Sequence, residues 1–79
     1  MRLPRDLSGL ELSKELRSLG YAVTRQTGSH IRMTTQLNGE HHLTVPAHDP
    51  LKVGTLRAIL DSVARHHQMS LESVIRMVG

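Results

Sequence analysis

One short stretch is the most informative about the fold of this chain: Gln26-Thr27-Gly28-Ser29-His30-Ile31-Arg32-Met33. The small polar residues in its first half predict a tight turn. The residues after the turn alternate in polarity, which predicts a strand with Ile31 and Met33 on its core face. His30 and Arg32 would then point away from the core. Because an imidazole moves protons near neutral pH and a guanidinium holds phosphate, this pair favours phosphodiester chemistry.

One strand precedes the turn, and a third follows later in the chain. Residues 21–26 are rich in strand-forming side chains, and residues 30–37 continue the strand that starts after the turn. Asn38-Gly39 is a strong two-residue hairpin signal, because a type I′ turn requires positive φ at both central positions. Residues 40–45 then form a third strand, which predicts a three-stranded antiparallel meander. The two-residue period places three side chains of the first strand on one face: Tyr21, Val23 and Arg25.

A helix is predicted before the sheet. Ser8 to Glu11 has the form of a capping box, in which the serine and glutamate side chains each accept a hydrogen bond from a backbone N–H. The leucines that follow are spaced by four and three residues, which predicts a helix over residues 9–19. Gly20 is expected to end this helix in a left-handed conformation.

Two further helices are predicted after the sheet. Pro46 ends the third strand, and Gly54-Thr55 begins a helix whose apolar residues recur at helical spacing. Ser70 caps a short last helix over residues 70–78. The order α-β-β-β-α with an extra C-terminal helix predicts an α+β fold, with both main helices on one face of the sheet. This is the layout of a double-stranded-RNA-binding domain.

The length of 79 residues predicts a single domain over residues 1–79, with its core within about 8–65. A domain of this size buries only about 60–65% of the surface of its unfolded chain, which favours a surface groove over an enclosed pocket. The predicted core consists of Leu12, Leu16, Leu19, Ile31, Met33, Leu43, Val45, Leu56, Ile59, Leu60 and Val63.

The composition excludes several classes of function. The chain has no cysteine, so it has no disulfide framework, thiolate nucleophile or zinc–thiolate site. Its first ten residues lack the apolar run of a signal peptide, and no segment approaches the roughly 18 apolar residues of a membrane span. We therefore expect a soluble, cytoplasmic protein with no membrane partner.

The charge distribution favours a polyanionic partner. The net charge is +3, and eight of the ten basic residues are arginines. Residues 16–39 carry Arg17, Arg25 and Arg32 without an acid, and residues 50–60 carry two further basic residues without an acid. Such a basic stripe indicates nucleic acid. Because Tyr21 is the single aromatic residue, we expect recognition through backbone, 2′-OH and shape rather than through stacking on bases.

Three motifs together resemble the HicA (YcfA-like) family of bacterial mRNA interferase toxins. They are Arg25-Gln26-x-Gly28-Ser29-His30, Val45-Pro46-x-His48 and Gly54-Thr55-Leu56-Arg57-x-Ile59-Leu60. The resemblance covers about residues 8–65. It implies a fold of the double-stranded-RNA-binding type, metal-independent cleavage of mRNA without a cofactor, and a HicB-type antitoxin that covers the active surface. The family's catalytic histidine corresponds to His30.

Chemical roles follow for the residues of these motifs and for two basic residues near them, Arg32 and Lys52. His30 would act as general base on an RNA 2′-OH, and the general acid for the leaving 5′-oxygen stays unassigned. The candidate RNA-binding residues are Arg25, Gly28, Ser29, Arg32, Lys52, Thr55 and Arg57. The arginines would hold phosphate, and the turn and the start of the second helix would offer free backbone N–H groups.

The remaining histidines have simpler interpretations. His41 and His42 are adjacent on a strand and point to opposite faces, so we expect no metal site there. His48 matches a family position, and we expect it to support its loop rather than to act in catalysis. His66 and His67 lie near a helix C-terminus, where positive charge is mildly favoured.

Two other classes of function stay open at this stage. The chain could be a non-catalytic RNA-binding module that uses the same basic face. It could also be an interaction protein that only pairs with a HicB-like partner. The apolar residues of the short C-terminal helix would in addition allow weak self-association.

Overall fold

The computed structural model describes residues 3–78. Its elements are α1 (Gly9–Glu15), the 3₁₀ helix η1 (Leu16–Leu19), β1 (Ala22–Thr27), β2 (His30–Thr35), β3 (His41–Pro46), α2 (Val53–His67) and α3 (Leu71–Val78). This order confirms the predicted α+β fold of the double-stranded-RNA-binding type.

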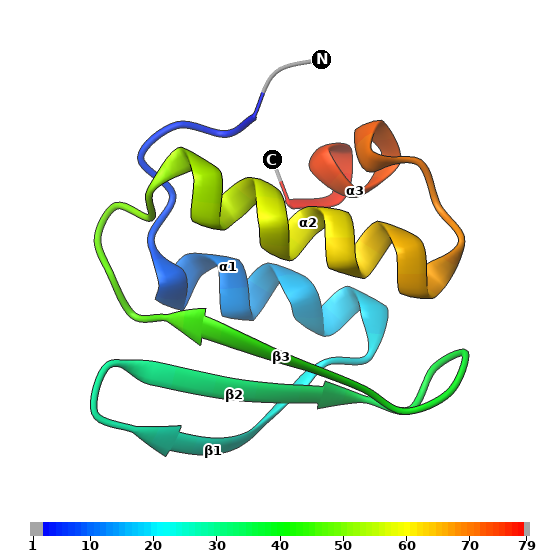
Figure 1. The fold of residues 1–79 in the computed structure, drawn as a ribbon, viewed down its shortest axis with the longest axis horizontal. Helices are drawn as coiled ribbons and strands as arrows, with labels where there is room; N and C mark the ends of the chain where they lie inside the picture. The colour runs from blue at the N-terminus through cyan, green and yellow to red at the C-terminus, as the bar shows by residue number, and fades with distance from the viewer. Residues whose placement is uncertain (1–2, 79) are drawn as a thin grey trace.

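The three strands form one antiparallel sheet in the order β1-β2-β3. Figure 1 shows the helices gathered on one side of the sheet, nearest to β3, with β1 farthest away. Both α1 and α2 contact β3. The predicted core is confirmed apart from Leu19, which is half-buried. The core also contains residues that were not predicted: Tyr21, Leu51, Ala64, Val74, Ile75 and Val78.

The hairpin between β2 and β3 is longer than predicted. Asn38 and Gly39 do have positive φ angles, 58° and 97°. However, β2 ends at Thr35. The buried hydroxyl of Thr35 forms hydrogen bonds with backbone groups at this point. Its Oγ1 donates to the Leu19 carbonyl at 2.9 Å and accepts from the Leu37 N–H at 3.1 Å. This side chain therefore ties the end of β2 to the end of η1.

A β-bulge in β1 makes the predicted face of this strand wrong. Val23 lies opposite Met33, on the core side, and the register then shifts so that Arg25 lies opposite Arg32. A bulge places an extra residue on one strand, which reverses the alternation of faces beyond it. Arg25 consequently lies on the face away from the core. Val23 stays 47% exposed, because β1 projects beyond the helices.

The first helix is bounded by the predicted signals. Ser8 and Glu11 form both hydrogen bonds of the capping box, at 3.0 and 3.1 Å. After the last turn tightens into η1, Gly20 ends the segment at a φ of 83°. A side chain at this position would also collide with Thr35, since a Cβ would fall 2.6 Å from its Oγ1.

The short helix α3 packs onto α1 and α2. The Ser70 hydroxyl accepts a hydrogen bond from the Ser73 N–H at 3.1 Å, which confirms the predicted cap. Val74, Ile75 and Val78 are buried against the rest of the chain. The apolar side chains on which the expected self-association rested are therefore part of the core.

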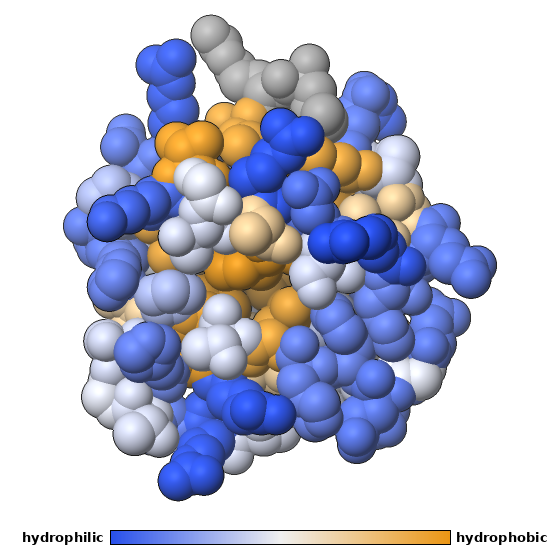
Figure 2. Space-filling view, in the orientation of Figure 1, coloured by the Kyte–Doolittle hydropathy of each residue, from blue (hydrophilic) through white to orange (hydrophobic). Residues whose placement is uncertain are grey.

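The surface differs between the helices and the sheet. In Figure 2, apolar side chains show around α2 and between α2 and the strands, whereas mostly hydrophilic side chains cover the region of the strands. No helix within residues 3–78 has the length and apolar character needed to cross a membrane.

Candidate functional site

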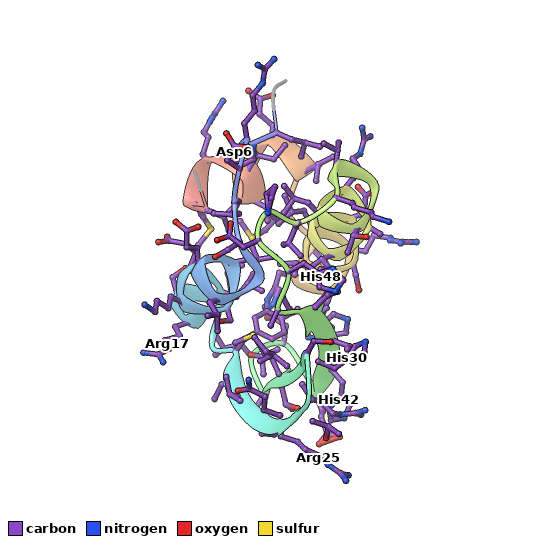
Figure 3. The ribbon with its side chains drawn as sticks, turned by 90° about the vertical axis from the view of Figure 1, so that its left-hand side faces the viewer. Asp6, Arg17, Arg25, His30, His42 and His48 are labelled. Carbon is purple, nitrogen blue, oxygen red and sulfur yellow. The ribbon has the colours of Figure 1, made fainter. Side chains whose placement is uncertain are left out.

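The helices within residues 3–78 all lie on one side of the sheet (Figure 1), and we name the other face of the sheet the open face. The side chains that the strand register places on it include Arg25, His30, Arg32, Thr34, His42 and Thr44. In Figure 3, Arg25, His30 and His42 point to the same side of the molecule, whereas Arg17 points to the opposite side. The predicted basic stripe is therefore wrong at Arg17, which lies in η1 on the side of the helices.

His30 stands at the start of β2, directly after the β1–β2 turn. It lies between Thr27 of β1 and Pro46 of β3 in the register, and its side chain is exposed. Within residues 3–78, its imidazole makes no hydrogen bond and no ion pair. Both ring nitrogens are therefore free to meet a ligand.

Arg25 and Arg32 face each other across β1 and β2. The three ion pairs among the described residues join His42 to Glu40, Arg57 to Asp61 and Arg76 to Glu72, so they leave both of these arginines uncompensated. Like charges directly opposite on a sheet destabilise it. An arrangement that keeps two guanidinium groups together on an exposed face is suited to an anion that bridges them.

His42 is held at the other end of the open face. Its Nδ1 lies 2.8 Å from the Thr34 hydroxyl, and its Nε2 lies 3.3 Å from a Glu40 carboxylate oxygen. His41 points to the other face of the sheet, as predicted. Within residues 3–78, no three His, Asp or Glu side chains lie together in a way that could hold a metal ion.

The β1–β2 turn has the predicted glycine in a left-handed conformation. Gly28 has a φ of 55°, and a Cβ there would meet nothing within 4 Å, so glycine is required for its backbone angle rather than for space. The Ser29 carbonyl accepts a hydrogen bond from the Ala47 N–H at 2.6 Å. The turn that precedes His30 is therefore tied to the chain that follows β3.

The start of α2 lies at the same end of the molecule as the start of β2 and the end of β3 (Figure 1). Lys52 is the N-cap residue and makes no side-chain cap, so the first N–H groups of the helix stay open. Thr55 is half-buried in the first turn. Arg57 is partly neutralised by Asp61, whose Oδ2 lies 3.6 Å from its Nε. These candidates are thus on a separate element from the open face.

The opposite end of the molecule holds an aromatic cluster that sequence analysis missed. It consists of Tyr21, His41, His66 and His67, and we name it the histidine cluster. The Tyr21 hydroxyl lies 2.7 Å from His41 Nδ1 and 3.1 Å from His67 Nε2. The rings of His41 and His66 stack at a centroid distance of 4.3 Å. Local spacing carries no signal for this cluster, because its members come from three separate segments.

Hydrogen bonds from the histidine cluster fasten the β2–β3 hairpin to α2. His66 Nε2 lies 3.0 Å from the carbonyls of both Leu37 and Gly39, and the Asn38 amide lies 3.2 Å from His67 Nδ1. The two carbonyls accept from an N–H on His66 Nε2, and the Asn38 amide donates to His67 Nδ1 when that nitrogen carries no proton. The cluster thus has a structural role at the end of the sheet farthest from His30.

Burial shifts the protonation of this cluster. It lowers the pKa of His41, with a further lowering from His66, and it lowers the pKa of His67 in the same way. Burial also raises the pKa of Tyr21 to about 12. Burial therefore opposes the positive charge that was expected at His67 near the helix end.

Comparison with protein families identifies the family to which this chain belongs. The family model described as the HicA toxin of bacterial toxin–antitoxin systems matches residues 9–69, from the start of α1 to just beyond α2. The chain therefore belongs to the HicA toxin family. Comparisons with curated proteins and with solved structures gave no match. Helix α3 lies beyond the matched segment.

Proposed function

We propose that this HicA-family chain is an endoribonuclease that cleaves mRNA in the cytoplasm, with His30 as general base. The observation that carries the proposal is the open face. There, an imidazole without a partner inside the described chain shares a face with two directly opposed arginines. Strands β1 and β2 contain no acidic residue that would compete with a phosphate.

The chemistry follows from the residues on this face. His30 removes the proton from an RNA 2′-OH, and the resulting oxygen attacks the adjacent phosphorus. The bond from phosphorus to the 5′-oxygen then breaks, and the leaving oxygen takes up a proton. One product therefore ends in a 2′,3′-cyclic phosphate and the other in a 5′-hydroxyl. Arg25 and Arg32 hold the non-bridging phosphate oxygens and stabilise the charge that develops on them. These steps need no metal ion.

Backbone groups complete the proposed RNA site. The turn at Gly28 and Ser29 offers N–H groups next to His30, and the open start of α2 at Lys52 and Thr55 offers a second position for a phosphate. Arg57 contributes less to phosphate binding, because its ion pair with Asp61 partly neutralises its charge. Recognition through phosphates and 2′-OH groups agrees with the absence of aromatic side chains from strands β1, β2 and β3 other than histidine.

The partner of this toxin is proposed to be a HicB-like antitoxin that covers the open face. The HicA toxin family belongs to toxin–antitoxin systems. An exposed imidazole and uncompensated arginines suit a partner that supplies carboxylates to the same positions, which would exclude RNA by competition.

The proposed activity is tested with purified protein, EDTA and a transcript of mRNA sequence. Wild type is expected to cleave the RNA in EDTA, and His30→Ala is expected to lose roughly 10²–10⁴-fold in rate, the usual contribution of a general base. His42→Ala is the matched control, because this histidine lies on the same face at the far end of β2 and β3.

The outcomes separate the functions that the sequence left open. Equal cleavage by wild type and His30→Ala would contradict the role of His30. If both proteins bind RNA with a steep salt dependence and neither cuts it, the chain is an RNA-binding module. If neither protein binds RNA, the open face serves only a protein partner.

A further inference from the structure

We propose that His48 is the general acid of this reaction and protonates the leaving 5′-oxygen. The inference rests on the proposed function and deepens it. Sequence analysis assigned His48 a supporting role in its loop, but the structure places the backbone of this loop beside the start of β2. In Figure 3, His30 and His48 point to the same side of the molecule.

Two contacts bring the loop that carries His48 beside the turn that carries His30. Pro46, two residues before His48, is the register partner of His30. The next residue, Ala47, donates its N–H to the Ser29 carbonyl at 2.6 Å. Because Ser29 directly precedes His30, both histidines extend from backbone segments that are hydrogen-bonded to each other.

The loop is also fixed from the side of α1. The Gly9 N–H donates to the His48 carbonyl at 2.9 Å, and the Leu51 N–H donates to the Leu7 carbonyl at 2.8 Å. Gly9 packs so closely that a Cβ there would fall 1.8 Å from the Pro46 carbonyl oxygen. The backbone of His48 is thus held on both sides, while its side chain stays exposed to a substrate. Such support is what a catalytic group needs in order to be preorganised.

Other proton donors fit this role less well. His42 is paired with Thr34, four residues along β2 from His30, so it is displaced by about 13 Å along the strand. The arginines keep their protons throughout the accessible pH range. Tyr21 is buried in the histidine cluster at the opposite end of the sheet. Lys52 is the remaining donor near this end, and it serves as a comparison variant.

The proposed step balances with the one at His30. A protonated His48 gives its proton to the 5′-oxygen as the bond from phosphorus to that oxygen breaks. His30 has meanwhile taken the proton of the 2′-OH as the new bond from oxygen to phosphorus forms. Solvent then returns one proton to His48 and removes one from His30, which restores both groups for the next turnover.

The experiment compares two RNA substrates that differ in one atom at the scissile bond. One has the natural 5′-oxygen, and the other has sulfur in its place, which leaves as a thiolate without needing a proton. We expect His48→Ala to slow cleavage of natural RNA roughly 10²–10⁴-fold and to cleave the sulfur substrate within a few-fold of wild type. His30→Ala should be slow on both substrates, and Lys52→Ala should not discriminate between them.

The pH dependence gives a second readout. The rate of wild type should fall on both sides of an optimum, because one group must be neutral and the other protonated. His48→Ala should lose the decline at high pH. Equal rates for His48→Ala and wild type on natural RNA would overturn the proposal, and so would an equal loss on both substrates, which indicates a structural role. If wild type cleaves neither substrate, the proposed ribonuclease function itself is wrong, and this inference falls with it.

Discussion

At the scale of single residues, the open face combines features that stability alone would not favour. Arg25 and Arg32 lie directly opposite each other, and neither has an ion-pair partner among residues 3–78. The His30 imidazole likewise makes no hydrogen bond to any residue that the structure describes. Residues that are left uncompensated in this way are typical of binding sites, where function is retained at some cost in stability.

A substitution at Arg32 should therefore change stability and RNA binding in opposite directions. Arg32→Thr removes one of two facing positive charges and introduces a good strand former. We expect it to raise the free energy of unfolding by about 0.2–1 kcal/mol, measured by urea denaturation. The same variant should bind RNA more weakly, with a salt slope reduced by about 1. A variant that loses both stability and binding would contradict the idea of electrostatic repulsion on the open face.

Gly9 is a second residue with a sharp expectation. Gly9→Ala places a methyl group 1.8 Å from the Pro46 carbonyl oxygen. The start of α1 or the loop after β3 must move, so we expect a loss of about 1–3 kcal/mol in the free energy of unfolding. Gly54→Ala is the matched control, because a Cβ there meets nothing within 4 Å. If both variants unfold at the same urea concentration, the close packing of α1 on this loop is not a stabilising feature.

At the scale of elements, the two ends of the sheet are fixed in different ways. Near His30, backbone hydrogen bonds link the β1–β2 turn, the loop after β3 and the start of α1. At the other end, side chains of the histidine cluster link the β2–β3 hairpin to α2. The first end stays open to a ligand, whereas the second is closed by partly buried rings.

The histidine cluster should make stability depend on pH. Burial lowers the pKa of His41 and His67 below the ordinary value of 6.5, so the unfolded chain binds more protons than the folded chain. The contribution of these two histidines to stability is therefore fully present above pH 6.5, the ordinary pKa of the unfolded chain. It is lost as the pH falls from 6.5 through the lower pKa values of the folded chain. The free energy of unfolding should be lower at about pH 5.5 than at about pH 7.5. In the double variant His41→Asn/His67→Gln, the difference in the free energy of unfolding between the two pH values should be smaller. An unchanged difference would show that other groups cause the pH dependence.

At the scale of the whole molecule, local patterns predicted the elements well. Helical leucine spacing, the capping box and Gly20 each act within a few residues, and the structure confirms them. Asn38-Gly39 marked the hairpin and its positive φ angles, but not its length. The bulge at Val23 and the histidine cluster were missed, because both depend on partners that are distant in sequence. For the candidate site, the alternation of polar and apolar residues after the turn predicted that His30 and Arg32 point away from the core, whereas the position of Arg17 depends on which side of the fold its helix occupies.

The C-terminal helix α3 is part of the core. Ile75 is 9% exposed and lies on α3, outside the family match. We expect Ile75→Ala to lower the free energy of unfolding by about 2 kcal/mol or more. Arg76→Ala is the control on the same helix, since its ion pair with Glu72 is exposed and should matter little. Equal thermal midpoints for the two variants would show that α3 does not contribute to the core.

The central claim is that His30 on the open face removes the proton from an RNA 2′-OH, whose oxygen then attacks the adjacent phosphorus. The most direct measurement is mass spectrometry of the RNA ends that purified wild-type protein produces in EDTA. The account predicts 2′,3′-cyclic phosphate and 5′-hydroxyl ends, and no cut at a position where the 2′-OH is replaced by hydrogen. Products with 3′-hydroxyl and 5′-phosphate ends, or cleavage next to a 2′-deoxy residue, would contradict it.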